Sequence, residues 1–206
     1  PMKAFRPRWE PVLRDRIPFA QAEMADNPDA QEVKRSKSRL VYRLPLQGPH
    51  GSRVTCYFKR YTQRRGWRGL FQVFRTRARR EYRIGLRFLE RDIRVAEPLG
   101  FAEHNPSLLK REEFLVLKEV PRARDLTEVI REKLEQKQRL NGLAEGLGSW
   151  LAEIHERGAY HDDLPIAHIL LSEEPDGTAI PYLIDLDAAR LYRNGVPLDG
   201  RVTNLA

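Results

Sequence analysis

The feature that most restricts the fold is a pair of alternating apolar runs around a Gly/Pro turn. Residues 38–47 (SRLVYRLPLQ) alternate between apolar and polar side chains, and residues 53–61 (RVTCYFKRY) do so again. The turn GPHG at 48–51 joins them. Two alternating runs joined by such a turn predict an antiparallel β-hairpin.

The rest of the chain keeps its helical and strand patterns apart. A helical pattern follows the hairpin, then a short apolar run, then two helical patterns, and finally two short strands. Residues 1–37 are polar and carry no clear pattern. The patterned segments in order are residues 38–61, 70–89, 113–120, 125–158 and 169–186. This segregated order predicts an α+β fold and not an alternating parallel sheet.

Positive charge is concentrated in one segment of this 206-residue chain. The chain carries a net charge of +8, and residues 58–80 contain nine Lys or Arg residues and no acid. Apolar residues recur within 64–80 at helical steps, so we expect a basic amphipathic helix that can lie on an anionic membrane surface. A phosphorylated glycolipid or a nucleic acid would also supply negative charge. No RNA- or DNA-binding motif is present, which disfavours nucleic acid.

The cysteine content and the hydropathy pattern favour a reducing compartment. The single cysteine, Cys56, excludes an internal disulfide and lies in an alternating run, where we expect a small core residue. No apolar run approaches the roughly 18 residues that a membrane span needs. The first residues lack the apolar core of a signal peptide. We therefore expect a cytoplasmic protein whose membrane contact, if any, is peripheral.

Carboxylates and histidines gather in two segments near the end of the chain. Residues 158–171 read GAYHDDLPIAHILL, and residues 182–190 read YLIDLDAAR. They place Asp163 and Asp185 at loop and strand ends in apolar surroundings. One such acid can accept the proton of an attacking hydroxyl, and a second can hold Mg²⁺, which prefers oxygen ligands. The pattern suits phosphoryl transfer.

These residues resemble the motifs of the protein-kinase-like fold. Residues 161–168 (HDDLPIAH) are similar to the catalytic loop H-R-D-L-x-x-x-N, and residues 185–187 to the metal-binding D-F-G. Lys59 in YFKRY resembles the strand lysine of kinases. Glu81 in RREYRIGLRFL resembles the helix glutamate that pairs with that lysine. Within that superfamily the chain resembles most closely the bacterial lipopolysaccharide kinases. Those kinases have a catalytic loop that ends in histidine, as this chain does at His168. They also have the sequence IDL in place of D-F-G, as this chain does at residues 184–186.

The resemblance implies a two-lobed kinase-like fold with a minimal C-terminal lobe. Residues 1–120 would form an N-terminal lobe of antiparallel sheet and one basic helix, with 1–37 unassigned. Residues 121–206 would form a truncated helical lobe with the catalytic and metal loops. The implied activity is ATP- and Mg²⁺-dependent phosphorylation of a sugar hydroxyl of the lipopolysaccharide inner core, at the cytoplasmic face of the inner membrane.

The resemblance also implies roles in nucleotide binding. Lys59 would contact the α- and β-phosphates of ATP and be oriented by Glu81. Backbone groups near Glu119, between the lobes, would bind adenine. No G-x-G-x-x-G is present, and the equivalent loop would lie near Lys34–Ser38 (KRSKS), meeting the phosphates by charge.

The catalytic and metal roles fall on the second half of the chain. Asp163 would orient and deprotonate the acceptor hydroxyl, and Asp185 would chelate Mg²⁺. His168 would act near the nucleotide as a neutral metal ligand or hydrogen-bond donor. His161 would hold the loop by a hydrogen bond to the backbone. Asp162 replaces the arginine that reads an activation-loop phosphate in other kinases, so we expect no control of that type.

Three alternatives remain at this stage. A small protein Ser/Thr kinase would keep the same catalytic residues, but few residues follow Asp185 to bind a peptide. A pseudokinase that serves as a binding module would explain the missing glycine loop. A nucleic-acid binder would use the basic segment and show steeply salt-dependent affinity.

Overall fold

The structure is a computed structural model that describes residues 3–14, 27–64, 76–107, 110–162 and 164–203. The chain divides into two compact units. The first comprises Pro1–Arg83 and Glu97–Glu119, and the second Ile84–Ala96 and Val120–Ala206. The boundary expected at residue 120 is displaced by one residue. Residues 84–96, which the sequence analysis assigned to the first lobe, group with the second unit.

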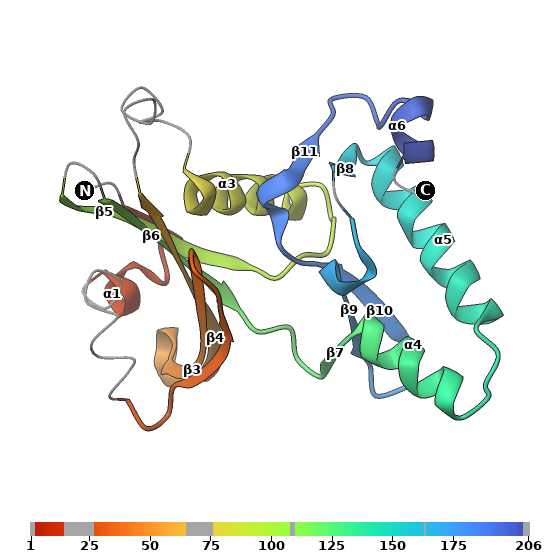
Figure 1. Ribbon diagram of the computed structural model, residues 1–206, viewed down its shortest axis with the longest axis horizontal. Coiled ribbons are helices and arrows are strands. Elements are labelled where there is room, and N and C mark those ends of the chain that lie inside the picture. Colours follow the sequence, from red (N-terminus) through yellow and green to blue (C-terminus); the bar gives the residue numbers. More distant parts are fainter. Residues whose placement is uncertain (1–2, 15–26, 65–75, 108–109, 163, 204–206) are drawn as a thin grey trace. The chain divides into compact units, whose positions relative to one another are not determined.

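The first unit is built on a six-stranded antiparallel sheet (Figure 1). Its order is β1-β5-β6-β4-β3-β2, in which β3 and β4 form the hairpin predicted from the alternating runs. Part of residues 1–37, which had no predicted structure, supplies strands at both edges of the sheet. The strands are β1 (Lys3–Phe5), β2 (Gln31–Arg35), β3 (Arg39–Gln47), β4 (Arg53–Arg64), β5 (Pro98–Ser107) and β6 (Lys110–Lys118).

One face of this sheet carries the core of the first unit. The apolar residues of β3 at positions 40, 42, 44 and 46 are buried there, as the alternation predicts. Cys56 is fully buried in the same cluster, and desolvation raises the pKa of its thiol to about 12. Trp9 and Leu13, at the short helix α1 (Glu10–Leu13), pack into this core from the N-terminal segment.

The second unit combines helices with two small sheets. A three-stranded sheet has the order β10-β9-β7, and β11 pairs with β8. Its strands are β7 (Ala123–Asp125), β8 (Ala159–His161), β9 (Ile169–Glu173), β10 (Ala179–Leu183) and β11 (Ala189–Leu191). Its helices are α4 (Leu126–Glu135), α5 (Asn141–Glu156) and α6 (Leu198–Thr203), with 3-10 turns η3 (Ile166–His168) and η4 (Leu186–Ala188). None of the helices in the described ranges is long and apolar enough to cross a membrane.

Local signals account for several of these boundaries. Asp125 caps α4, where its side chain accepts a hydrogen bond from the backbone N–H of Thr127. Residues 174–177 form the turn that joins β9 to β10, with Gly177 at φ +83°. The helix predicted over 70–89 is α3 (Arg77–Leu89). Residues 70–75 of that prediction lie outside the described residues.

Gly158 ends the turn that follows α5 and leads into β8. Its φ of +89° lies in the left-handed region, and a Cβ at this position would lie 2.3 Å from the carbonyl oxygen of Tyr192. The backbone N–H of Tyr192 donates to the carbonyl of Gly158 at 2.8 Å, and this hydrogen bond holds the two segments close together. Both the conformation and the close contact therefore require glycine here.

We predict that Gly158→Ala lowers the free energy of unfolding by about 2 kcal/mol or more, because the alanine combines a strained φ with a clash. Gly146→Ala is the matched control, since Gly146 lies within α5 and a Cβ there meets no atom within 4 Å. The control should gain up to about 1 kcal/mol from helix propensity. Urea unfolding measures both variants. Equal changes of the same sign would contradict this account.

Candidate active site

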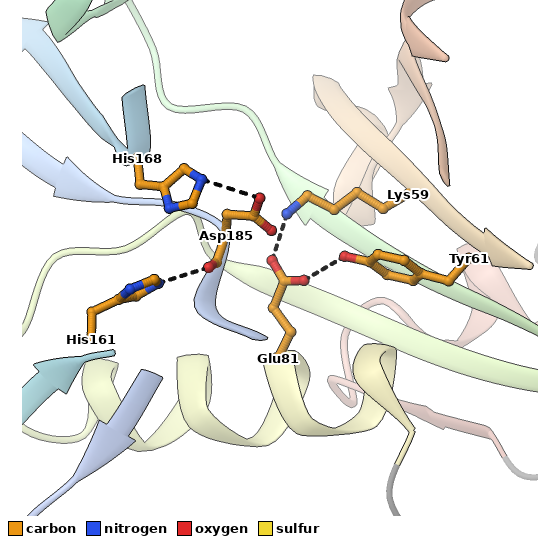
Figure 2. Close-up of polar contacts among 6 residues, drawn as sticks. All are labelled: Lys59, Tyr61, Glu81, His161, His168 and Asp185. Atoms are coloured by element: carbon orange, nitrogen blue, oxygen red, sulfur yellow. Dashed lines mark hydrogen bonds and ion pairs between the residues drawn. The ribbon is translucent and has the colours of Figure 1, made fainter. Parts of the chain in front are cut away.

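A buried lysine–glutamate pair joins the sheet of the first unit to helix α3. Lys59 lies in β4 and Glu81 in the second turn of α3, and both side chains are almost fully buried. Nζ of Lys59 donates to Oε1 of Glu81 at 2.5 Å (Figure 2). The structure thus brings together the two residues that the kinase motifs paired. Removing one partner of such a pair strands a buried charge, at a cost of about 3–5 kcal/mol.

Tyr61 is a third member of this group that the sequence analysis did not single out. Its hydroxyl donates to Oε2 of Glu81 at 2.7 Å, and its side chain is buried (Figure 2). Lys59 and Tyr61 are two residues apart in a strand, so they project from the same face of the sheet. The two-residue spacing of Lys59 and Tyr61 is evident in the sequence. The spacing alone does not show which residues of the strand contact Glu81.

Two buried acids hold the beginning of α3 against the same sheet. Oε2 of Glu113 accepts a hydrogen bond from the backbone N–H of Ala78 at 3.1 Å, and Oε1 of Glu103 accepts one from Thr76 Oγ1 at 2.6 Å. Glu103 and Glu113 lie opposite each other in β5 and β6. Burial raises the pKa of the Glu113 carboxyl. Acceptors at this position satisfy a free N–H group of the first helical turn.

The basic segment, which itself contains no acid, contacts acids from other elements of the fold. Lys59 pairs with Glu81, and the Arg60 guanidinium pairs with Glu112 of β6 at 2.7 Å. These acids lie at least 20 residues away along the chain. Part of the positive charge that the sequence assigned to an external partner is therefore neutralised within the first unit.

Glu119, expected near the adenine, takes part in a polar cluster at the end of the first unit. Nε of Arg43 donates to its Oε1 at 2.6 Å and Nη2 to its Oε2 at 3.1 Å, and the Tyr57 hydroxyl donates to Oε1 at 3.3 Å. The backbone N–H of Glu119 donates to the carbonyl of Thr55 at 2.9 Å. Adenine recognition by this stretch would therefore rely on a group other than the Glu119 N–H.

The segment at 34–38, expected to meet the phosphates, spans the end of β2 and the turn into β3. The Ser36 N–H donates to the Arg39 carbonyl at 2.7 Å, and the Arg39 N–H donates to Ser36 Oγ at 3.1 Å. Lys34, near the end of β2, and Lys37, in the turn, are both exposed. The strand before the turn, β2, is not predicted from the sequence. The exposed lysines agree with the expectation that this segment meets phosphates by charge.

In the second unit, both histidines of the catalytic-loop motif lie against Asp185. Nε2 of His161 is 2.9 Å from the backbone oxygen of Asp185, which is the backbone contact expected of His161. Nε2 of His168 is 3.5 Å from Oδ2 of Asp185. Figure 2 shows both rings directed at Asp185, one at its main chain and the other at its carboxylate. The backbone N–H of Ile184 also donates to the His168 carbonyl at 2.9 Å.

The conformation of Asp185 is itself unusual. It follows β10 with φ 62° and ψ 56°, in the left-handed region that non-glycine residues rarely adopt. The two histidine contacts and the neighbouring hydrogen bond fix this conformation. Strain of this kind is commonly found at functional sites.

The donor set fits a hard cation at Asp185. A carboxylate is a ligand that Mg²⁺ prefers, and Mg²⁺ keeps several water or phosphate oxygens in its coordination shell. Within the described ranges, no three His, Cys, Asp or Glu side chains form a cluster that could hold a metal alone. An imidazole is a poorer ligand for Mg²⁺. The 3.5 Å approach of His168 to the carboxylate therefore favours its hydrogen-bond role over its ligand role.

Asp163, the expected catalytic base, lies outside the described residues. Its neighbour Asp162 pairs with the Arg190 guanidinium of β11 at 2.6 Å, and the Asp162 N–H donates to the Ala188 carbonyl at 3.2 Å. The position that holds an arginine in other kinases therefore carries a structural ion pair in this chain.

Comparisons with known proteins agree with these features. A solved structure described as "WaaP in complex with acyl carrier protein" matches with a TM-score of 0.66 and 19% identity, over 100% of this chain and 78% of that chain. This likeness confirms the expected α+β, protein-kinase-like fold.

A curated relative also matches part of the chain. The 3-deoxy-D-manno-octulosonic acid (Kdo) kinase of Vibrio parahaemolyticus serotype O3:K6 (strain RIMD 2210633) is 28% identical over 120 residues. The match covers 58% of this chain and 47% of the relative, so the chain spans about half the length of the protein it matches. The model of the lipopolysaccharide kinase (Kdo/WaaP) family matches residues 30–197, a range that includes Lys59, Glu81 and Asp185. The chain therefore belongs to the lipopolysaccharide kinase (Kdo/WaaP) family.

Proposed function

We propose that the chain transfers the γ-phosphoryl group of ATP, with Mg²⁺, to a sugar hydroxyl of the lipopolysaccharide inner core. The observation that carries this proposal is the buried Lys59–Glu81 pair, because a buried ammonium fixed by one carboxylate is suited to binding phosphate oxygens. Family membership and the name of the Kdo kinase relative support a sugar as acceptor.

In the first unit, the residues would bind and orient the nucleotide. Lys59 would contact the α- and β-phosphates, and Glu81 would keep its ammonium group in place. Two exposed lysines, Lys34 near the end of β2 and Lys37 in the turn that follows, would add positive charge near the phosphates. Backbone groups beside Glu119 would bind adenine.

In the second unit, the residues would prepare the acceptor and hold the metal. Asp163 would accept the proton of the acceptor hydroxyl as its oxygen bonds to the γ-phosphorus and the bond to ADP breaks. Asp185 would hold Mg²⁺, which when bound neutralises charge on the phosphate oxygens. His168 would orient the Asp185 carboxylate, and His161 would fix the backbone of the same residue.

We further propose that the protein works at the cytoplasmic face of the inner membrane and contacts its anionic surface through α3. Residues 65–75 of the expected basic helix lie outside the described residues. In the described part, α3 exposes arginines 77, 80, 83 and 87 at three- and four-residue steps, which place them on one face over about 15 Å. Such like-charge neighbours repel each other in an isolated helix, and an anionic surface would offset that repulsion.

To test the reaction, the protein is incubated with labelled ATP and Mg²⁺. One reaction contains Kdo-containing core glycolipid, and a parallel reaction contains a protein substrate. We expect labelling of the glycolipid only. Lys59→Met and Asp185→Asn should each reduce the rate at least 100-fold, because each removes a charge that stabilises the transferring phosphoryl group. Glu173→Gln is the matched control, since Glu173 is an exposed acid at the end of β9.

Two outcomes would point to the alternatives. Labelling of protein in preference to glycolipid would indicate a Ser/Thr kinase. No labelling, together with no thermal shift at millimolar Mg-ATP, would indicate a binding module and contradict the proposed reaction.

The membrane contact is tested by sedimentation with phosphatidylglycerol-containing vesicles. Replacing Arg77, Arg83 and Arg87 together by Gln should weaken binding about 100-fold, at roughly 1 kcal/mol for each basic residue near the surface. The matched control replaces three exposed basic residues elsewhere, Arg131, Lys137 and Arg139, by Gln. Equal loss in both variants would show that only net charge matters, and would contradict a specific role of α3.

A further inference from the structure

Tyr61 supplies the second hydrogen bond to the carboxylate that holds Lys59. Oε1 of Glu81 accepts from Lys59 at 2.5 Å, and Oε2 accepts from the Tyr61 hydroxyl at 2.7 Å (Figure 2). Each carboxylate oxygen thus has its own buried donor. The proposed reaction uses Lys59 and Glu81 and leaves the hydroxyl of Tyr61 unexplained.

Without that hydroxyl, the orientation of the carboxylate would be poorly fixed. The last torsion of a glutamate side chain is broad, so a single donor leaves the carboxylate free to rotate about it. Oε2 would also be left buried without this donor, at a cost of about 1–3 kcal/mol. A rotated carboxylate would carry the Lys59 ammonium away from its position. Tyr61 therefore restricts Glu81 to the orientation that faces Lys59.

The ring of Tyr61 is in turn fixed from both neighbouring strands. Arg39 lies opposite it in β3, with the guanidinium carbon 5.7 Å from the ring centroid. Glu113 lies opposite it in β6 and accepts a hydrogen bond from Ala78 of α3. Ala78 and Glu81 are three residues apart and lie on the same side of α3. The strand pair that places Tyr61 thus also fixes the first turn of the helix.

We propose that Tyr61 is a positioning residue for phosphoryl transfer, which orients Glu81 and through it the ammonium group of Lys59. The proposal rests on the proposed function, since it assigns Tyr61 a role in the same nucleotide site. Tyr61 acts on the lysine through the glutamate, and its hydroxyl takes no part in proton transfer.

The test compares Tyr61→Phe with Tyr82→Phe in steady-state kinetics of the full chain. Tyr61→Phe keeps the buried ring and removes only the hydroxyl. Tyr82 follows Glu81 in α3 and is also buried, but its ring packs on Phe101, with centroids 5.1 Å apart. We expect Tyr61→Phe to lower kcat/KM for ATP about tenfold or more, as loss of a hydrogen bond to a charged group implies. KM for the acceptor should stay within twofold, and Tyr82→Phe should change neither constant more than twofold.

A double-mutant cycle separates positioning from general damage. In a Glu81→Gln background, Tyr61→Phe should cost at most twofold in kcat/KM, because the carboxylate it orients is gone. Thermal melting of each variant checks that it is folded. An equal loss in both backgrounds, or a parallel rise in the KM of the acceptor, would overturn the role of Tyr61. A wild-type chain without transfer activity would instead overturn the proposed function on which this role rests.

Discussion

The buried contact between Lys59 and Glu81 is the interaction on which the first unit is organised. Two charges removed from water are tolerated only where geometry and further hydrogen bonds compensate their desolvation. The sheet supplies that compensation through Tyr61, which satisfies the second carboxylate oxygen. Glu113 fixes the start of α3, and this keeps Glu81 beside Lys59 and Tyr61. The strand register and the position of α3 thus both stabilise the ion pair between Lys59 and Glu81.

The sequence predicts those features of the fold and the site that are determined by residues near one another in the chain. The β3–β4 hairpin and the burial of Cys56 follow from neighbouring residues, and both are present. Lys59 and Glu81 were paired by motif order alone. Tyr61 and Glu113 could not be predicted, because their contacts depend on cross-strand register and on where α3 packs.

Two sequence expectations change for the same physical reason. The acid-free basic segment meets Glu112 because β4 and β6 lie side by side in the sheet, and it meets Glu81 because α3 brings this residue to Lys59. Residues 84–96 belong to the second unit because Phe88 and Ile93 are buried in its core. An apolar pattern shows that a residue is buried, but it does not show which of two cores receives it.

The most direct test of this account is equilibrium binding of Mg-ATP to the wild-type chain and to Lys59→Met, Glu81→Gln and the double variant. If the pair acts as one unit on the phosphates, each single variant weakens binding and the double variant binds no more weakly than Lys59→Met alone. Unchanged binding in Lys59→Met, or losses that add in the double variant, would contradict it.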